Sequence, residues 1–115
     1  MRRGAVFHML TCFNLEPGRD ISSFKVALDA FCNHMHQLEM VEGMSPIGER
    51  QSDTIMDTDE ERDHQYFFTM TFRDRAQVDA AVELINSQQA PTDESHRALF
   101  YIIKDPIFIC WQDVT

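Results

Sequence analysis

The sequence predicts a single α+β domain in which one antiparallel sheet carries helices on one of its faces. Its 115 residues are enough to build one hydrophobic core and leave no room for a second domain, so we treat residues 1–115 as one domain. Stretches rich in aromatic and β-branched residues alternate with stretches whose apolar residues recur every three or four positions. The order of these stretches predicts strand, helix, strand, strand, helix, short helix and strand.

The first predicted strand, residues 6–15, has apolar residues at both odd and even positions. A strand with this pattern has to be covered on both of its faces. We expect it to end before Pro17 and Gly18, because proline has no N–H to donate and glycine adopts a positive φ without strain. Asp20 or Ser22 then offers an N-cap for a helix.

The first helix is predicted over residues 21–38. Its apolar side chains recur at intervals of four and three and form one stripe, which we expect to lie on the sheet: Phe24, Leu28, Phe31, Met35 and Leu38. Gly43 is the expected C-terminal cap, since glycine is common just beyond a helix end.

The segment after this helix is predicted to contain a second, weaker strand near residues 47–51 and then a long acidic loop. Residues 52–63 hold six carboxylates and one arginine, and their only large apolar side chains are Ile55 and Met56. This composition predicts a solvated, mobile loop. A calcium-binding loop is the alternative, but the segment lacks the glycine and the spaced oxygen ligands that such a loop needs.

Residues 64–72 are aromatic and β-branched and predict the clearest strand after the first. Asp74 then offers an N-cap for a helix over residues 75–86. The apolar side chains of this helix share one face, which predicts its buried stripe: Val78, Ala81, Val82 and Ile85.

The pattern of residues 95–104 is compatible with either a strand or a short helix. The five consecutive apolar residues 99–103 are compatible with a strand, but we prefer a short helix, because Asp93 or Ser95 offers a cap and residues 105–106 (Asp-Pro) form a stop signal. The last strand is predicted over residues 107–114. It places Ile107, Ile109 and Trp111 on one face, with Phe108 and Cys110 on the other.

This order of elements is the βαββαβ arrangement of ferredoxin-like folds, in which a four-stranded antiparallel sheet has its helices on one face. The other face then exposes apolar side chains over a larger area than a stable monomer usually tolerates. We therefore predict a homodimer that buries the sheet faces.

Three segments resemble the dimeric α/β-barrel superfamily, which includes stress-responsive barrel proteins and antibiotic-biosynthesis monooxygenases: residues 13–18 (FNLEPG), Phe24 in the first helix, and residues 71–74 (TFRD) before the second. The likeness extends over nearly the whole chain in the order of its elements. It implies two sheets facing one another around a shared barrel, and a cavity between sheet and helices that can hold a small hydrophobic molecule. Members range from cofactor-independent oxygenases and polyketide cyclases to proteins with no known activity, so the fold leaves the function open.

Composition limits the partners. A formal charge of −9 disfavours nucleic acid, and no apolar segment approaches the roughly 20 residues that span a bilayer, so neither nucleic acid nor a membrane is expected. The three cysteines are odd in number and lack CxxC spacing, which is typical of buried thiols in a cytoplasmic protein. His34 and His36 would share a metal only on a strand. His64 and His96 have no partner at ligand spacing and are expected at the surface, so we predict no metal and no cofactor. A second copy of the chain and a small apolar ligand are the expected partners.

Candidate site residues come from the strands and their ends. His8 lies within a core strand, where a neutral imidazole is either a general base or a structural residue with a hydrogen-bond partner. Strand alternation places it with Leu10 and Cys12, on the face away from the helices. Asn14, Arg50, Gln65 and Trp111 are predicted to form a polar ring around a ligand pocket, with Arg50 orienting a carboxylate or phenolate oxygen. The alternative is that these polar groups lie at strand ends in water.

Two hypotheses about function remain. The first is a non-catalytic homodimeric module that binds a small apolar ligand or only dimerises. The second is a cofactor-independent oxygenase or cyclase that acts on a phenolic or polyketide-like substrate with His8 as base. We prefer the first, because the sequence contains no convincing acid–base pair.

Overall fold

The computed structural model of the protein describes residues 4–114. Its elements in chain order are β1 (Phe7–Leu15), α1 (Ile21–Gln37), β2 (Gly43–Met44), β3 (Gly48–Glu49), β4 (Tyr66–Phe72), α2 (Arg75–Asn86), α3 (Thr92–Phe100) and β5 (Ile103–Gln112).

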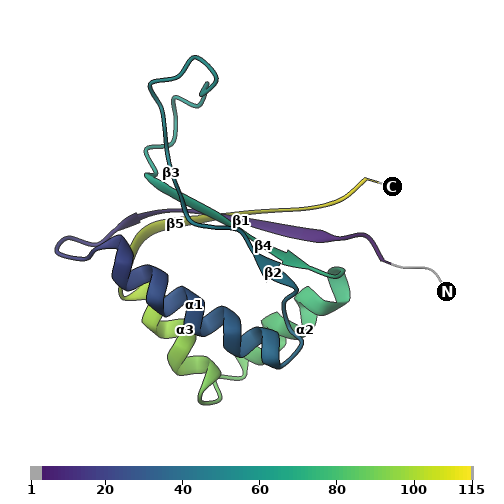
Figure 1. The fold of residues 1–115 in the computed structure, drawn as a ribbon. Coiled ribbons are helices and arrows are strands. Elements are labelled where there is room, and N and C mark those ends of the chain that lie inside the picture. The colour runs from purple at the N-terminus through teal and green to yellow at the C-terminus, as the bar shows by residue number, and fades with distance from the viewer. Residues whose placement is uncertain (1–3, 115) are drawn as a thin grey trace.

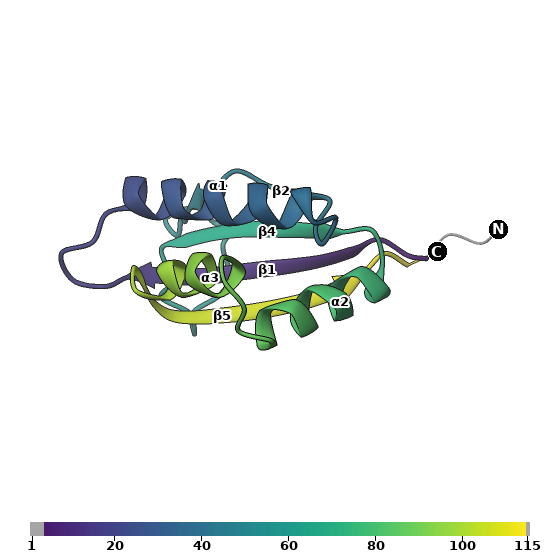
Figure 2. The same cartoon turned by 90° about the horizontal axis from the view of Figure 1, so that it is seen from below.

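The strands form one antiparallel sheet in the order β2-β4-β1-β5, and β3 pairs with β4 beside β2. All three helices lie on one face of this sheet, as Figure 1 shows. Seen from the helix side, α1 runs along β4 while α2 and α3 lie towards β5 (Figure 2). The predicted ferredoxin-like α+β fold is confirmed. The weak strand predicted near residues 47–51 is present only as β3, and β2 lies before it, where no strand was predicted. The two short strands together form one edge of the sheet.

The turn after β1 forms as predicted. Gly18 has a φ of 81°, in the region that favours glycine. The Asp20 carboxylate accepts a hydrogen bond from the backbone N–H of Ser23 at 2.7 Å and so caps α1. β1 is therefore held to a fixed length before the chain turns onto the helix layer.

The buried stripe of α1 is confirmed except at its end. Phe24, Leu28, Phe31 and Met35 are buried, but Leu38 is 43% exposed, because the helix ends at Gln37. The predicted Gly43 cap is wrong, since Gly43 belongs to β2 and the left-handed residue is Glu39, with a φ of 58°. The backbone N–H groups of Leu38, Glu39 and Met40 pair with carbonyls of the last helical turn. The Gln77 side chain of α2 donates to the Glu39 carbonyl at 2.9 Å and so holds the turn that follows the helix.

The acidic loop is better anchored than its composition predicts. The Arg50 side chain donates to both carboxylate oxygens of Asp57, at 2.8 and 2.9 Å, and to the backbone carbonyls of Asp59 and Arg62. Arg62 in turn pairs with the Asp59 carboxylate. We call residues 50–65 the arm. It stands away from the sheet on the side opposite the helices (Figure 1). Its mobility stays a prediction.

The helices that follow β4 agree with the sequence in type. Asp74 caps α2 by accepting from the backbone N–H of Gln77 at 2.9 Å, as predicted. The helix predicted over residues 95–104 is confirmed only as far as Phe100, because β5 begins at Ile103. It begins at Thr92 and uses neither Asp93 nor Ser95 as a cap. Thr92 instead hydrogen-bonds the His34 ring at 2.6 Å, which joins α3 to α1.

β5 is longer than predicted. The expected stop at residues 105–106 is wrong, because the strand runs through them from Ile103 to Gln112. Asp105 has a φ of 53°, and the register with β1 shifts between Cys12 and Asn14, so the Asp-Pro pair forms an irregularity instead of an end. β5 is an edge strand, where a proline need not interrupt a ladder.

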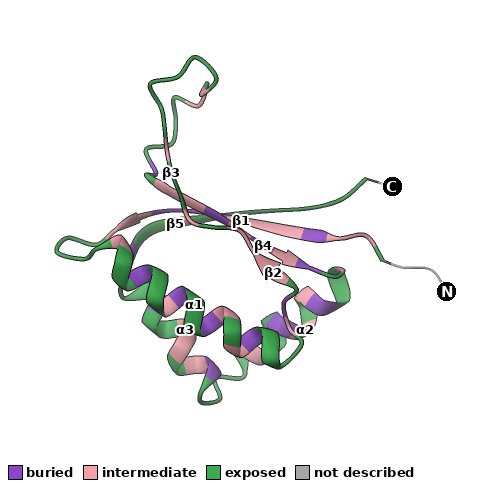
Figure 3. Ribbon diagram, in the orientation of Figure 1, coloured by how far each residue is buried: buried purple, intermediate pink, exposed green. Residues whose placement is uncertain are grey.

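The two faces of the sheet differ in what covers them. On the helix side, Phe13 is fully buried and its ring centre lies 4.6 Å from that of Phe24. Strand alternation places a second apolar set on the other side, which we call the open face: Leu10, Phe67, Ile107, Ile109 and Trp111. β5 remains largely exposed there, as Figure 3 shows. The predicted division of β5 between two faces is confirmed.

Candidate functional site

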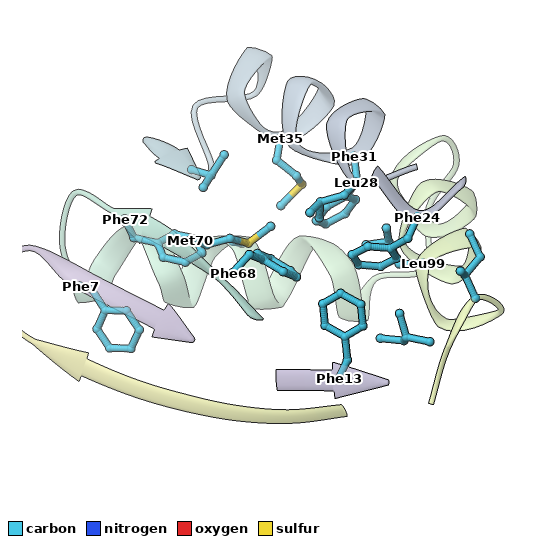
Figure 4. Close-up of a cluster of buried hydrophobic side chains, with 14 residues drawn as sticks. Phe7, Phe13, Phe24, Leu28, Phe31, Met35, Phe68, Met70, Phe72 and Leu99 are labelled. Carbon is cyan, nitrogen blue, oxygen red and sulfur yellow. The ribbon is translucent and has the colours of Figure 1, made fainter. Parts of the chain in front are cut away.

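A cavity of about 370 Å³ lies between the sheet and the helices. Figure 4 shows side chains of α1 pointing towards those of β4 around this space. Its apolar walls come from both layers and include Met9, Phe24, Leu28, Phe31, Met35, Phe68, Met70, Val78, Ala81 and Leu99. An apolar cavity of this size with few polar groups is typical of a small-molecule site.

Thr11 is the most deeply buried polar side chain in the wall. It occupies a helix-facing position of β1 and is 2% exposed. Its hydroxyl oxygen is buried without a hydrogen-bond partner among the described residues. Buried hydroxyl groups are normally paired, so Thr11 leaves an unused donor and acceptor within the cavity wall. A threonine among the bulky residues of the first strand was a signal that our sequence reading missed.

His96 is the second polar group. It extends from α3, with its ring centre 4.9 Å from that of Phe100 and 5.6 Å from that of Phe31. Burial lowers the pKa of the imidazole, although the nearby Asp93 carboxylate opposes this shift. His96 is therefore neutral at pH 7 and can accept or donate one hydrogen bond. Asn86, at the end of α2, also belongs to the lining.

The cavity opens to solvent beside β5. Three large apolar lining residues are half exposed: Val82 of α2 (50%), Phe100 of α3 (40%) and Phe108 of β5 (46%). We call these three residues the mouth. The sequence predicted that Val82 would be buried in the stripe of its helix, and this was wrong because α2 leaves part of the β5 edge uncovered (Figure 2).

None of the five predicted site residues lines this cavity. At one end of the open face, the His8 ring stacks on Trp111 with ring centres 5.3 Å apart, and its Nε2 lies 2.8 Å from a carboxylate oxygen of Asp113. At the other end, the Asn14 side chain accepts from the backbone N–H of Gln65 at 2.9 Å.

The structure therefore forms two separate groups instead of the single polar ring that the sequence predicted. Arg50 is engaged within the arm. Catalytic or binding roles for these five residues stay predictions.

The remaining histidines also differ from expectation. His64 was predicted at the surface but is buried, with Nε2 2.8 Å from the Asp105 carbonyl. His96 was also predicted at the surface and instead lines the cavity.

Over residues 4–114, no cluster of three or more His, Cys, Asp or Glu side chains is arranged to hold a metal ion. Cys12, Cys32 and Cys110 are free thiols. None of the described helices has the length and apolar character to cross a bilayer.

No family model matches the chain, and no curated protein matches it. The chain is, however, similar to several solved structures. A protein from Arabidopsis thaliana is similar with a TM-score of 0.69 and 12% identity over 96% of each chain. SnoaB, a cofactor-independent oxygenase from Streptomyces nogalater, has a TM-score of 0.61 and 9% identity over 97% of this chain and 96% of its own.

A third similar structure is a dimeric ferredoxin-like protein of unknown function from Thermobifida fusca, with a TM-score of 0.62 and 7% identity over 97% of this chain and 94% of its own. Identities this low carry information about the fold alone. They agree with the fold that the sequence resemblance implied, and the chain therefore has the ferredoxin-like architecture of these proteins.

Proposed function

We propose that the protein binds a small, largely apolar molecule with one polar group in the cavity between its sheet and its helices. The observation that carries this proposal is the Thr11 hydroxyl, buried in an apolar wall without a partner. Leaving such a group unpaired costs about 1 to 3 kcal/mol. A ligand hydroxyl or carbonyl that pairs with Thr11 would remove this cost when it binds.

The lining also limits the kind of ligand. The volume of about 370 Å³ is near the lower end of the range for small-molecule sites, which favours a compact ligand. Phe31, Phe100 and the His96 ring supply aromatic surfaces near one another, and aromatic pairs prefer offset or edge contacts. A compact phenol or aromatic ketone satisfies both the walls and the two polar groups.

We also propose that two copies of the chain pair through their open faces. Ile107, Ile109 and Trp111 are exposed on that face, and a pairing of standard size, on the order of 1,500 to 2,500 Å², would cover them. The dimeric state of the similar Thermobifida fusca protein supports this proposal.

A cavity-filling variant tests ligand binding. Ala81 is buried in the cavity wall, so Ala81→Phe places a phenyl ring in the space that a ligand would use. Calorimetric titration with 1-naphthol should give saturable binding to the wild type and none to this variant. Ala76→Phe, at an exposed position of the same helix, is the matched control and should bind normally. Equal binding to the wild type and Ala81→Phe would refute the proposed site.

Catalysis in the same cavity is the second candidate. It is favoured by the neutral His96 imidazole beside aromatic surfaces, since a neutral imidazole is a competent general base. SnoaB is a cofactor-independent oxygenase of similar fold, which makes oxygenation or cyclisation of a phenolic compound the reaction class to assay first. His8 would be the base only in a pocket on the open face. Loss of turnover in His96→Gln, with turnover retained in His8→Asn, would assign the reaction to the cavity.

A further inference from the structure

The arm carries two adjacent apolar side chains that no other described residue covers. Ile55 is 92% exposed and Met56 is 84% exposed. Figure 3 shows the arm as mostly exposed along its length. Yet hydrogen bonds from Arg50 to Asp57 and to two backbone carbonyls brace the arm. A braced loop that presents adjacent large apolar side chains is suited to contact with another molecule.

The direction of the arm identifies that molecule as a second copy, and this step depends on the proposed homodimer. The arm rises on the side of the open face (Figure 1). Half of its sixteen residues, fully extended at about 3.3 Å each, would reach roughly 25 Å, and the contact between Arg50 and Asp57 keeps the arm shorter than this limit. Stacked sheets lie only about 10 Å apart. When two copies pair through their open faces, the arm is therefore longer than the gap between the sheets and can pass the edge of the partner's sheet.

Exposed apolar side chains indicate which edge of the partner the arm meets. The arm leaves the sheet at the β3–β4 edge, and β5 forms the opposite edge. A two-fold axis along the strands sets the β3 edge of one copy over the β5 edge of its partner. An axis across the strands would instead set each arm over the β2–β3 edge of its partner, away from β5. Only the first arrangement brings Ile55 and Met56 to the exposed Phe100 and Phe108, so burial of apolar surface favours it.

The mouth of the cavity lies along this β5 edge. The arm joins β4 beside Gln65, which hydrogen-bonds Asn14, and Asn14 pairs in register with Lys104 of β5. The arm therefore leaves the sheet at the level of the start of β5, near Phe100 and Phe108. Lys104 is exposed there and would face acidic side chains of the arriving arm.

We propose that the arm of each copy closes the mouth of its partner's cavity, with Ile55 and Met56 packed on Phe100 and Phe108. In this arrangement the ligand site is complete only in the dimer, because its entrance is formed by one chain and covered by the other.

Photo-crosslinking tests the contact directly. A p-benzoylphenylalanine residue replaces Met56, and the irradiated protein is digested and mapped by mass spectrometry. We expect crosslinks between chains from position 56 to the segment that holds Phe100 and Phe108. The same group in place of Val26, an exposed residue of α1, is the control and should give no crosslink between chains. Three results in a sample that sediments as a dimer would overturn the proposal: crosslinks to the partner's arm, crosslinks confined to one chain, or no crosslinks.

Ligand exchange gives a second readout. In Ile55→Ser/Met56→Ser the open faces are unchanged, so sedimentation should still show a dimer. Dissociation of 1-naphthol should become roughly tenfold faster, equivalent to about 1.4 kcal/mol of lost contact. An unchanged dissociation rate in an intact dimer would contradict closure by the arm and leave the binding site itself standing. A wild-type monomer at all concentrations would refute the homodimer, and the arm contact with it.

Discussion

Thr11→Val is expected to change stability and ligand affinity in opposite directions. The two side chains have nearly the same shape, so the substitution removes a hydroxyl without opening a hole. Thr11 is 2% exposed and its hydroxyl has no partner among the described residues, so the free protein carries the cost of an unpaired buried group. Removing that group should stabilise the free protein by about 1 to 3 kcal/mol. For a domain of this size we expect roughly 4 °C in melting temperature per kcal/mol.

The same substitution should weaken binding of a ligand that uses the hydroxyl. A net hydrogen bond contributes about 0.5 to 1.5 kcal/mol, so the affinity for 1-naphthol should fall roughly 2- to 12-fold. Naphthalene, which has no hydroxyl, should bind the variant at least as well as it binds the wild type. Thr69→Val is the matched control, because Thr69 pairs with Leu10 and belongs to the opposite face of the sheet. Melting curves and calorimetry measure both effects. A destabilised Thr11→Val protein with unchanged affinity would refute the role we assign to Thr11.

Three further predictions concern other residues. Burial lowers the pKa of His96 below its usual 6.5, so the unfolded chain binds a proton at this residue before the folded protein does. The contribution of His96 to stability is therefore complete above pH 6.5 and should be lost as the pH falls through the folded pKa. Urea unfolding at several pH values should show this loss in the wild type and not in His96→Gln. Native alkylation at pH 8 should modify exposed Cys110 first and spare Cys32, because burial raises the pKa of the Cys32 thiol to about 12; equal labelling rates in mass spectra would refute this order. Arg50→Ala removes the side chain that braces the arm, so limited proteolysis should cut within residues 50–65 faster than in the wild type, and an unchanged rate would show that the arm does not depend on Arg50.

Local patterns were sufficient to predict the elements of the fold. The spacing of Phe24, Leu28, Phe31 and Met35 predicted the face that α1 buries. Asp20 was one of two cap candidates for α1, and Asp74 was the candidate for α2, because they precede apolar periodic segments. The errors lie where a distant residue decides the outcome. Gly43 belongs to β2 because it pairs with Thr71 of β4, 28 residues away in sequence, and no local signal at Gly43 reveals this. β5 likewise continues through Pro106 because it is an edge strand that pairs with β1.

The candidate site was harder to predict than the fold. Strand alternation correctly separated His8 from the helix-facing residues of β1, but it could not show that the enclosed cavity would form on the helix side. The cavity depends on how three helices rest on the sheet, and Thr11 and His96 become its polar groups only through that packing. Likewise, Asn14 and Gln65 meet because their strands pair, while His8 and Trp111 stack at the other end.

The methionine methyl groups offer the most direct measurement of the central claim, that a small apolar molecule binds between sheet and helices. Met9, Met35 and Met70 line the cavity, whereas Met44 does not. In methyl NMR spectra of ¹³C-methionine-labelled protein, saturating 1-naphthol should shift the three cavity methyls, give contacts from them to the aromatic protons of the ligand, and leave Met44 unchanged. Ala81→Phe should abolish these changes. Saturable binding that leaves Met9, Met35 and Met70 unshifted, or no binding at all, would contradict the account.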